Sequence, residues 1–294
     1  MMLLVTLTSL SRSSDVPSCK CRSSYLANHT MCQYQPRSCG GQPSLILDNS
    51  RLTSEEVFLV LDTHNTLREQ IANGSLLASA GMQPAEDMKE LVYCAEAERI
   101  AQCWVEQCKF EHDFERRLGR FEAGGQNLAI YYYITPEFDF YEHCKYNFPQ
   151  AITGWFNELY DPGFPPSAVA PFDAVPGTLH FTQMVWASTR YIGCARICHK
   201  DSTVPNKYNR LYACVYYNIG NTISYNMYTP GEPNCTAHNM DFSANYPSLC
   251  VPREVDEHEC PVYEDNFFTL VTENPEYNEV HDEENHATTE YPEN

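Results

Sequence analysis

The chain carries 14 cysteines in 294 residues, and this number constrains its fold more than any other feature. So many free thiols would be a liability in a reducing compartment, whereas an even number suits disulfides formed on the secretory route. Three N-glycosylation sequons, at Asn28, Asn73 and Asn234, agree with secretion. Zinc is the rival use of cysteine, but the spacings hold no pair of C-x2-C units, and the C-x3-C at Cys194 is weak alone. We therefore expect a secreted, extracellular, disulfide-rich glycoprotein.

The formal net charge of -20 is spread unevenly along the chain. Residues 251–294 hold 14 acidic residues and one basic residue. The last part, 261–294, is polar and sparse in aliphatic residues, so it cannot bury enough surface to offset its chain entropy, and we expect a disordered acidic tail there. An acidic chain lacks the basic face that nucleic acids and anionic membranes require, which argues against both kinds of partner.

We expect one folded domain with extensions at both ends. Residues 1–18 contain a short apolar run with no basic residue before it, which indicates a weak or truncated signal-like segment. A Cys-rich extension without regular structure is expected over 19–52, the main domain over 53–230, and a Cys-containing C-terminal extension over 231–260. No later stretch approaches the ~20 apolar residues that a transmembrane helix needs.

Apolar spacing predicts three helices. Thr53 and Glu56 form a capping box before the first helix, which is expected to end at Asn73. His64 lies on the apolar face of this helix and is read as a core histidine, and Arg68 one turn later is expected to bind a neighbouring carbonyl or carboxylate. The second helix is predicted to start near Pro84, with one apolar face that runs to Cys108, and the third to span about 150–160.

Strand signals follow the helices. The run 180–189 alternates like a strand, and 191–197 and 211–217 are short β-rich runs. Because helices come first and strands cluster later, we expect a mixed or antiparallel sheet with helices stacked around it. Between them, 161–178 holds five prolines, two phenylalanines and only two charged residues. This segment is long for a loop in a compact domain, which favours a functional role.

Generic catalytic signatures such as H-E-x-x-H, G-x-S-x-G and the P-loop are absent from the sequence. The informative segments are instead His64–Arg68, Phe110–His112 with Gly125–Leu128, Trp155–Glu158, His180–Trp186 and Tyr212–Asn221. Together they resemble the CAP superfamily (SCP/TAPS) of cysteine-rich secretory proteins, antigen 5 and pathogenesis-related-1 proteins, and helminth venom-allergen-like proteins in particular. The H-F-T-Q-M-V-W run is the most specific of these signatures.

The resemblance implies a three-layer α-β-α sandwich whose central cleft is lined by His112, Gln126, Glu158 and His180. Many family members have Glu where this chain has Gln126. The two imidazoles and Glu158 could hold Zn²⁺ with an open position, but a neutral amide is a poor zinc ligand and cannot act as a general base. We therefore expect no required cofactor, with a divalent cation as a possibility, and no catalytic residue. The alternative for the four residues is a hydrogen-bonded polar network.

The family's loop before the main signature contacts sterols, and the matching segment here offers Phe156, Tyr160, Phe164 and Phe172. An apolar surface loop either packs down or meets a partner, so simple packing stays open as the alternative. The resemblance also suggests two disulfides, Cys108–Cys198 and Cys194–Cys214. It leaves the other ten cysteines unassigned.

These observations predict a non-enzymatic secreted protein that binds a sterol or fatty acid and extracellular or host proteins. Two alternatives remain at this point. The first is a divalent-metal-dependent hydrolase that uses the central cleft, which the glutamine at position 126 disfavours. The second is a protein-interaction scaffold in which the proline-rich loop only packs.

Overall fold

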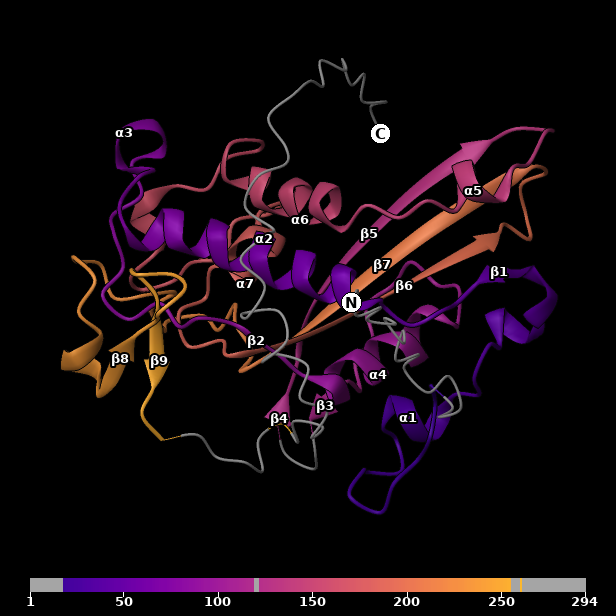
Figure 1. Ribbon diagram of the computed structural model, residues 1–294, viewed down its shortest axis with the longest axis horizontal. Helices are drawn as coiled ribbons and strands as arrows, with labels where there is room; N and C mark the ends of the chain where they lie inside the picture. The colour runs from indigo at the N-terminus through magenta and orange to yellow at the C-terminus, as the bar shows by residue number, and fades with distance from the viewer. Residues whose placement is uncertain (1–17, 119–121, 255–259, 261–294) are drawn as a thin grey trace, which may run out of the picture. The chain divides into compact units, whose positions relative to one another are not determined.

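The computed structural model describes residues 18–118, 122–254 and 260 (Figure 1). Most of the predicted signal-like segment and the whole of the predicted acidic tail lie outside these residues. Within the described part, no helix combines the length and the hydropathy that a membrane crossing requires.

A five-stranded sheet forms the centre of the domain. Four strands follow one another as neighbours in the order β1 (Ile46–Asp48), β6 (Tyr191–Lys200), β7 (Lys207–Tyr217) and β5 (Gly125–Ile134), and each neighbouring pair is antiparallel. The fifth, β2 (Val92–Tyr93), runs parallel to β6. The sheet is therefore mixed, as expected, and β6 and β7 contain the two predicted β-rich runs.

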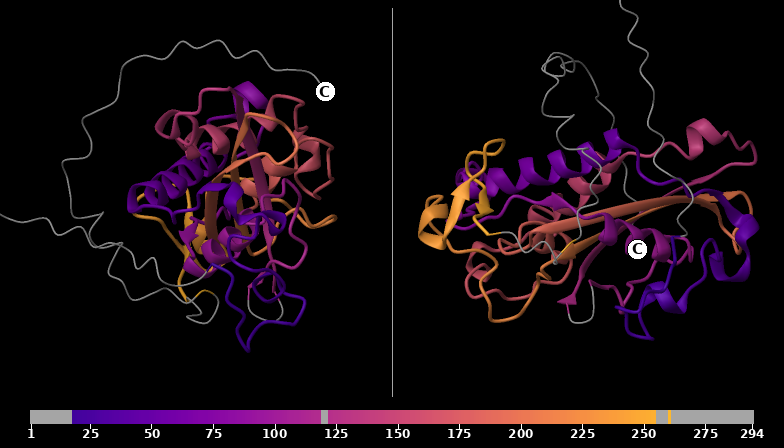
Figure 2. Two further views of the ribbon diagram at one scale, coloured as in Figure 1. Left: turned by 90° about the vertical axis from the view of Figure 1, so that its right-hand side faces the viewer. Right: turned by 60° about the horizontal axis from the view of Figure 1, so that its bottom comes forward.

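Helices cover both faces of this sheet (Figure 2). One face packs against α2 (Ser54–Ala72), α6 (Phe148–Phe156) and α7 (Leu179–Met184), and the other packs against α4 (Ala95–Val105). Each interface holds its own apolar cluster. This arrangement is the expected three-layer α-β-α sandwich, and it rests on side chains that alternate between the two faces along β5, β6 and β7.

The first and third helices agree with the sequence prediction. Thr53 Oγ1 accepts the Glu56 N–H at 3.2 Å and Glu56 Oε2 accepts the Thr53 N–H at 2.8 Å, so the capping box of α2 is confirmed. The helix α6 continues as the 3-10 turn η3 (Asn157–Leu159), close to the predicted end. The second helix was placed too early, because α4 begins at Ala95 rather than near Pro84.

The prediction of a strand over 180–189 is wrong, because the segment begins with the helix α7. Phe181, Thr182, Gln183 and Met184 are all buried there. A short helix that is buried nearly all round shows no 3.6-residue pattern, so alternation of polar and apolar residues misled the prediction. The long edge strand β5 was not predicted, because its start is small and polar and its end is a run of three tyrosines.

The Cys-rich extension is more ordered than expected. It contains α1 (Thr30–Gln33), two 3-10 turns, η1 (Cys39–Gly41) and η2 (Pro43–Leu45), and the strand β1, which pairs with β6. The buried carboxylate of Glu106, just after α4, holds it in place by accepting the Arg37 N–H at 2.8 Å and the Asn49 side-chain amide at 2.8 Å. The expectation of a segment without regular structure is therefore wrong in part.

All 14 cysteines form disulfides. Cys194 is joined to Cys214, the expected partner on the neighbouring strand. The suggested Cys108–Cys198 bridge is wrong: Cys108 is joined to Cys39 of the extension, and Cys198 to Cys144. The remaining bridges are Cys19–Cys103, Cys21–Cys32, Cys94–Cys260 and Cys235–Cys250.

The other elements are short. They are α3 (Leu77–Ala80), β3 (Arg117–Leu118), β4 (Glu122–Ala123), α5 (Phe140–His143), η4 (Pro166–Ala168), η5 (Cys235–His238), β8 (Met240–Phe242) and β9 (Cys250–Pro252). The strands β8 and β9 pair with each other, and a disulfide joins Cys250 of β9 to Cys235 of η5. The C-terminal extension therefore forms a small hairpin of its own.

Candidate functional site

The four residues of the predicted cleft form two hydrogen-bonded pairs at the edge strand β5. The first pair joins His112, in the segment after α4, to Gln126 near the start of β5. His112 Nδ1 lies 2.9 Å from Gln126 Oε1, which also accepts the Asp113 N–H at 3.0 Å. An amide oxygen can only accept, so Nδ1 of His112 carries the proton and Nε2 presents its lone pair.

The amide nitrogen of Gln126 is unusual. The residue is 6% exposed, and its Nε2 has no hydrogen-bond partner among the described residues. A buried donor without a partner costs free energy, and no carboxylate stands at this position to accept a proton. The pair therefore orients one imidazole and adds no negative charge to the cleft.

The second pair joins Glu158 of η3 to His180 of α7, in the helical layer on the other side of the sheet from α4. His180 Nδ1 lies 2.5 Å from Glu158 Oε1, while Glu158 Oε2 accepts the backbone N–H groups of His180 at 2.9 Å and Phe181 at 3.1 Å. These N–H groups belong to the first turn of α7, whose N-cap residue Thr178 makes no side-chain cap bond. Glu158 thus caps α7 and orients His180, and both of its oxygens already accept hydrogen bonds.

A zinc ion would find a partial ligand set here. Each imidazole presents Nε2 while its Nδ1 proton is held by an oxygen, which is the orientation usual for metal-binding histidines. Glu158 is not a free ligand, however, which corrects the set of His112, His180 and Glu158 taken from the resemblance. Those three residues do not bring their ligand atoms within 4.8 Å of one another; in the part of the chain that the structure describes, only Cys39, Cys108 and His199 do, and these cysteines form a disulfide.

The proline-rich loop packs down through its aromatic side chains. Phe156, Phe164 and Phe172 are all buried and, with Phe181, form a connected aromatic cluster whose ring centroids lie 5.4–6.4 Å apart. The prediction that these three residues offer surface contacts is therefore wrong. Tyr160 is the exception, because 51% of it is exposed.

The buried polar residues of α2 include the two that the sequence analysis singled out, His64 and Arg68. His64 Nδ1 donates to the Val60 carbonyl at 2.7 Å, and its Nε2 accepts from the Tyr216 hydroxyl at 2.9 Å, so it is the satisfied core histidine that was predicted. The guanidinium of Arg68 is fully buried and donates to backbone carbonyls only, including those of Lys89 and Met184.

Sequence reasoning assigned no role to Asn127, the residue after Gln126. Its Nδ2 donates to the His180 carbonyl at 3.0 Å and to the Tyr216 hydroxyl at 3.3 Å. Asn127 thereby connects the edge strand, α7 and the hydrogen bonds of His64. Its place within the segment Gly125–Leu128 was the only signal for it in the sequence.

The three sequon asparagines, Asn28, Asn73 and Asn234, are all exposed. Each could therefore carry a glycan without displacing core residues.

Comparisons with known proteins agree on one family. The family model described as "Cysteine-rich secretory protein family" (CAP) matches residues 61–217. "Venom allergen 3" of Solenopsis invicta is 34% identical over 209 residues, which cover 69% of this chain and 83% of that protein. "Venom allergen 5" of Polistes dominula is 29% identical over 240 residues, covering 78% of this chain and 96% of that one.

Two solved structures share the fold. The structure of BmVAL-1 has a TM-score of 0.55 and 26% identity, and the alignment covers 70% of this chain and 98% of that one. The structure of NaASP2 with Zn2+ has a TM-score of 0.52 and 25% identity, and the alignment covers 69% of this chain and 99% of that one.

Proposed function

Because the chain belongs to the cysteine-rich secretory protein (CAP) family, we propose that it acts outside the cell by binding rather than by catalysis. The observation that carries this proposal is the state of the cleft. Gln126 stands where a second carboxylate would be needed, and both oxygens of Glu158 accept hydrogen bonds from α7 and His180. No carboxylate among these four residues is therefore free to act as a general base.

The ligand class that we propose is a small apolar lipid, a sterol or a fatty acid, with extracellular proteins as further partners. The contact surface is the outer side of the loop 160–178 together with the start of α7. Tyr160 is 51% exposed and Leu179 is 43% exposed, and the buried aromatic cluster below holds the loop in place. An exposed apolar pair on a nearly uncharged, preorganised loop suits a flat apolar ligand.

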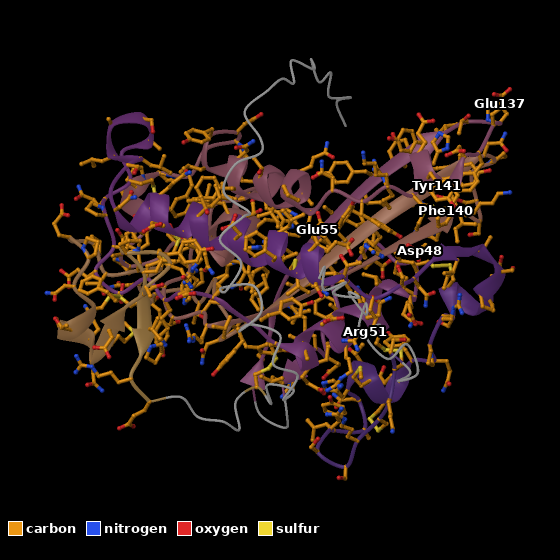
Figure 3. All side chains as sticks on the ribbon, in the orientation of Figure 1. Asp48, Arg51, Glu55, Glu137, Phe140 and Tyr141 are labelled. Atoms are coloured by element: carbon orange, nitrogen blue, oxygen red, sulfur yellow. A yellow bond between two sulfur atoms is a disulfide. The ribbon has the colours of Figure 1, made fainter. Side chains whose placement is uncertain are left out.

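The test is a titration with radiolabelled cholesterol. Replacing Tyr160 and Leu179 together by serine is expected to weaken binding about tenfold or more, because each side chain would lose apolar burial of the order of 1.5 kcal/mol. Substitution of Phe164 or Phe172 would be uninformative, since both are core residues. The matched control is Tyr141→Ser: this tyrosine is 85% exposed and lies on α5, at the far end of the strands (Figure 3).

Two outcomes would contradict the lipid proposal. One is saturable cholesterol binding that the double variant leaves unchanged. The other is no saturable binding by the unaltered protein, which would favour a protein-interaction scaffold whose loop only packs.

Zinc binding is the second candidate function, favoured by the free Nε2 atoms of His112 and His180. A zinc ion, when bound, would supply Lewis-acid chemistry, and these two imidazoles would hold it. We expect weak binding, because two protein ligands are fewer than the three of catalytic zinc sites. Equilibrium dialysis should show at most one zinc per chain, lost in His112→Ala and in His180→Ala; binding that survives both changes would place the metal elsewhere.

A further inference from the structure

The opposite end of the sheet carries a pocket of about 470 Å³ that neither candidate function uses. It exists because the strands are longer than the helix beside them. The 11 residues of α4 span about 16 Å, whereas the 10 and 11 residues of β6 and β7 span more than about 30 Å. Figure 1 shows the strands continuing past α4 toward β1. The segment after α4 and the turn η1 enclose this end instead.

The pocket and the cleft lie at different positions along β5. Tyr132 lines the pocket and Gln126 lies in the cleft, six positions earlier on β5, and six strand residues span about 20 Å. On β5 the two sites are therefore separate, while the segment after α4 contributes to both, with Phe110 in the pocket wall and His112 in the cleft.

One row of side chains across three strands contributes to the pocket wall. Asn209 of β7 stands directly opposite His199 of β6 and Tyr132 of β5, so the three share one face of the sheet. Ile130, two residues before Tyr132, lies on the same face and lines the pocket as well. The wall therefore combines an imidazole and an amide with an aromatic ring and an aliphatic side chain.

Two atoms in this row are buried acceptors without a partner. His199 is 5% exposed and Asn209 is 2% exposed, and neither His199 Nε2 nor Asn209 Oδ1 has a hydrogen-bond partner among the described residues. His199 Nδ1 contacts the Lys200 carbonyl at 3.3 Å, which places the proton on Nδ1 and the lone pair on Nε2. Burial also lowers the pKa of His199, which keeps the ring neutral. Both atoms can only accept, so they call for a ligand that donates hydrogen bonds.

Cations dominate the charged groups of the pocket. Lys109, Lys200 and Lys207 line it together with a single carboxylate, Asp201. That carboxylate is already engaged, since its oxygens accept from Thr203, Val204 and Asn209 and Lys207 Nζ lies 3.3 Å away. The excess positive charge of the pocket therefore comes from Lys109 and Lys200, and both of these lysines are exposed.

We propose that this pocket binds a hydroxylated organic anion of the size of an acidic monosaccharide. The hydroxyl groups would donate to His199 and Asn209, the anionic group would meet Lys109 and Lys200, and the sugar ring would lie against Tyr132. A cationic amine could also donate to the two acceptors, but the two lysines would repel it. A metal is disfavoured because Cys39 and Cys108, the sulfur atoms nearest His199, are joined in a disulfide.

Saturation-transfer NMR with glucuronate at low salt tests the proposal. Glucose, the neutral sugar of similar size, and acetate, an anion without hydroxyls, are titrated in parallel. Glucuronate is expected to bind more tightly than either, and the double variant Lys109→Gln, Lys200→Gln is expected to lose about tenfold in affinity, as two exposed charge pairs would allow. Lys145→Gln is the matched control, an exposed lysine outside the pocket.

A further variant separates the hydroxyl contacts from the charge contacts. His199→Phe removes one of the two acceptors and is expected to reduce the preference for glucuronate over acetate, provided that its circular dichroism is unchanged. If this variant does not fold, the lysine double variant alone tests the proposal. A tetrasaccharide that contains glucuronate distinguishes a free sugar acid from a polysaccharide as the natural ligand. Tighter binding of the tetrasaccharide than of the monosaccharide indicates a polysaccharide, and no binding of the tetrasaccharide indicates a free sugar acid. Equal affinity for glucuronate and glucose, or a lysine double variant with unchanged affinity, would overturn the proposal.

Discussion

Replacing Arg68 by methionine is expected to lower the free energy of unfolding by about 4 kcal/mol, because the guanidinium donates to several backbone carbonyls at once. It donates to the carbonyls of Lys89 at 2.6 Å, Met184 at 2.7 Å and Trp186 at 2.9 Å. Longer bonds run to Ala187 and Thr189. These carbonyls belong to the segment before β2, to the end of α7 and to the turn between α7 and β6, so Arg68 joins these parts of the chain. Arg190 adds to the same connection by donating to the Glu90 carbonyl at 2.6 Å.

Urea denaturation of the unaltered protein and the variant measures the effect. Burial lowers the pKa of Arg68 to about 9, so the side chain remains charged at neutral pH, and its hydrogen bonds go to backbone carbonyls. Arg68→Lys, with fewer donors in a different geometry, should lose less than the methionine variant. Arg253→Met is the control, because that arginine pairs with Asp241 at an exposed site and its loss should cost less than about 1 kcal/mol. A loss of that small size in Arg68→Met would contradict the prediction.

Lowering the pH from 7 to 4.5 is expected to cost the protein about 2.5 kcal/mol of stability through His64 alone. Burial lowers the pKa of this histidine from 6.5 to about 4, while the unfolded chain keeps the ordinary value. Between these two values the unfolded state binds more protons than the native state, so stability falls as the pH falls. The buried ring has no room for a second proton, because its Nε2 accepts the Tyr216 hydroxyl.

The variant His64→Gln separates this contribution from the protonation of carboxylates. An amide can donate and accept in place of the imidazole and does not titrate, so the variant should lose less stability than the unaltered protein over the same pH interval. Burial lowers the pKa values of His29 and His199 as well, and these groups act in the same direction in both proteins. Equal losses in the two proteins would show that His64 does not control the acid sensitivity.

The sequence predicted best where one local interaction determines the structure. The capping box at Thr53 fixed the start of α2, and the core position of His64 followed from its place on the apolar face. The disulfide partner of Cys108 could not be predicted, because Cys39 is brought beside it only when the extension folds along α4 and β6. The family resemblance suggested a pairing with Cys198, which is joined to Cys144 instead.

In the candidate site, too, the sequence predicted local features but not those that depend on tertiary contacts. The four cleft residues were found from their motifs, and they do pair, but the cap that Glu158 forms on α7 depends on the direction of a short helix that had been read as a strand. Likewise, the aromatic residues of the loop carry no signal that separates packing from ligand contact. Whether Phe164 faces the core or solvent depends on Phe172 and Phe181, which reach it only in the folded chain.

The helix α4 is shorter than the strands β6 and β7 that it covers. Different parts of the chain therefore cover the two halves of the sheet face on which α4 lies. The half under α4 is closed by the helix itself, whereas the other half is closed by residues from the Cys-rich extension, tied down by Cys19–Cys103 and Cys39–Cys108. Gly40 and Leu45 of the extension line the pocket, so a substitution at either position changes the pocket wall directly. The surface at this end of the sheet is therefore shaped by a segment other than the helix, and two disulfides fasten that segment to α4 and to the residues just after it.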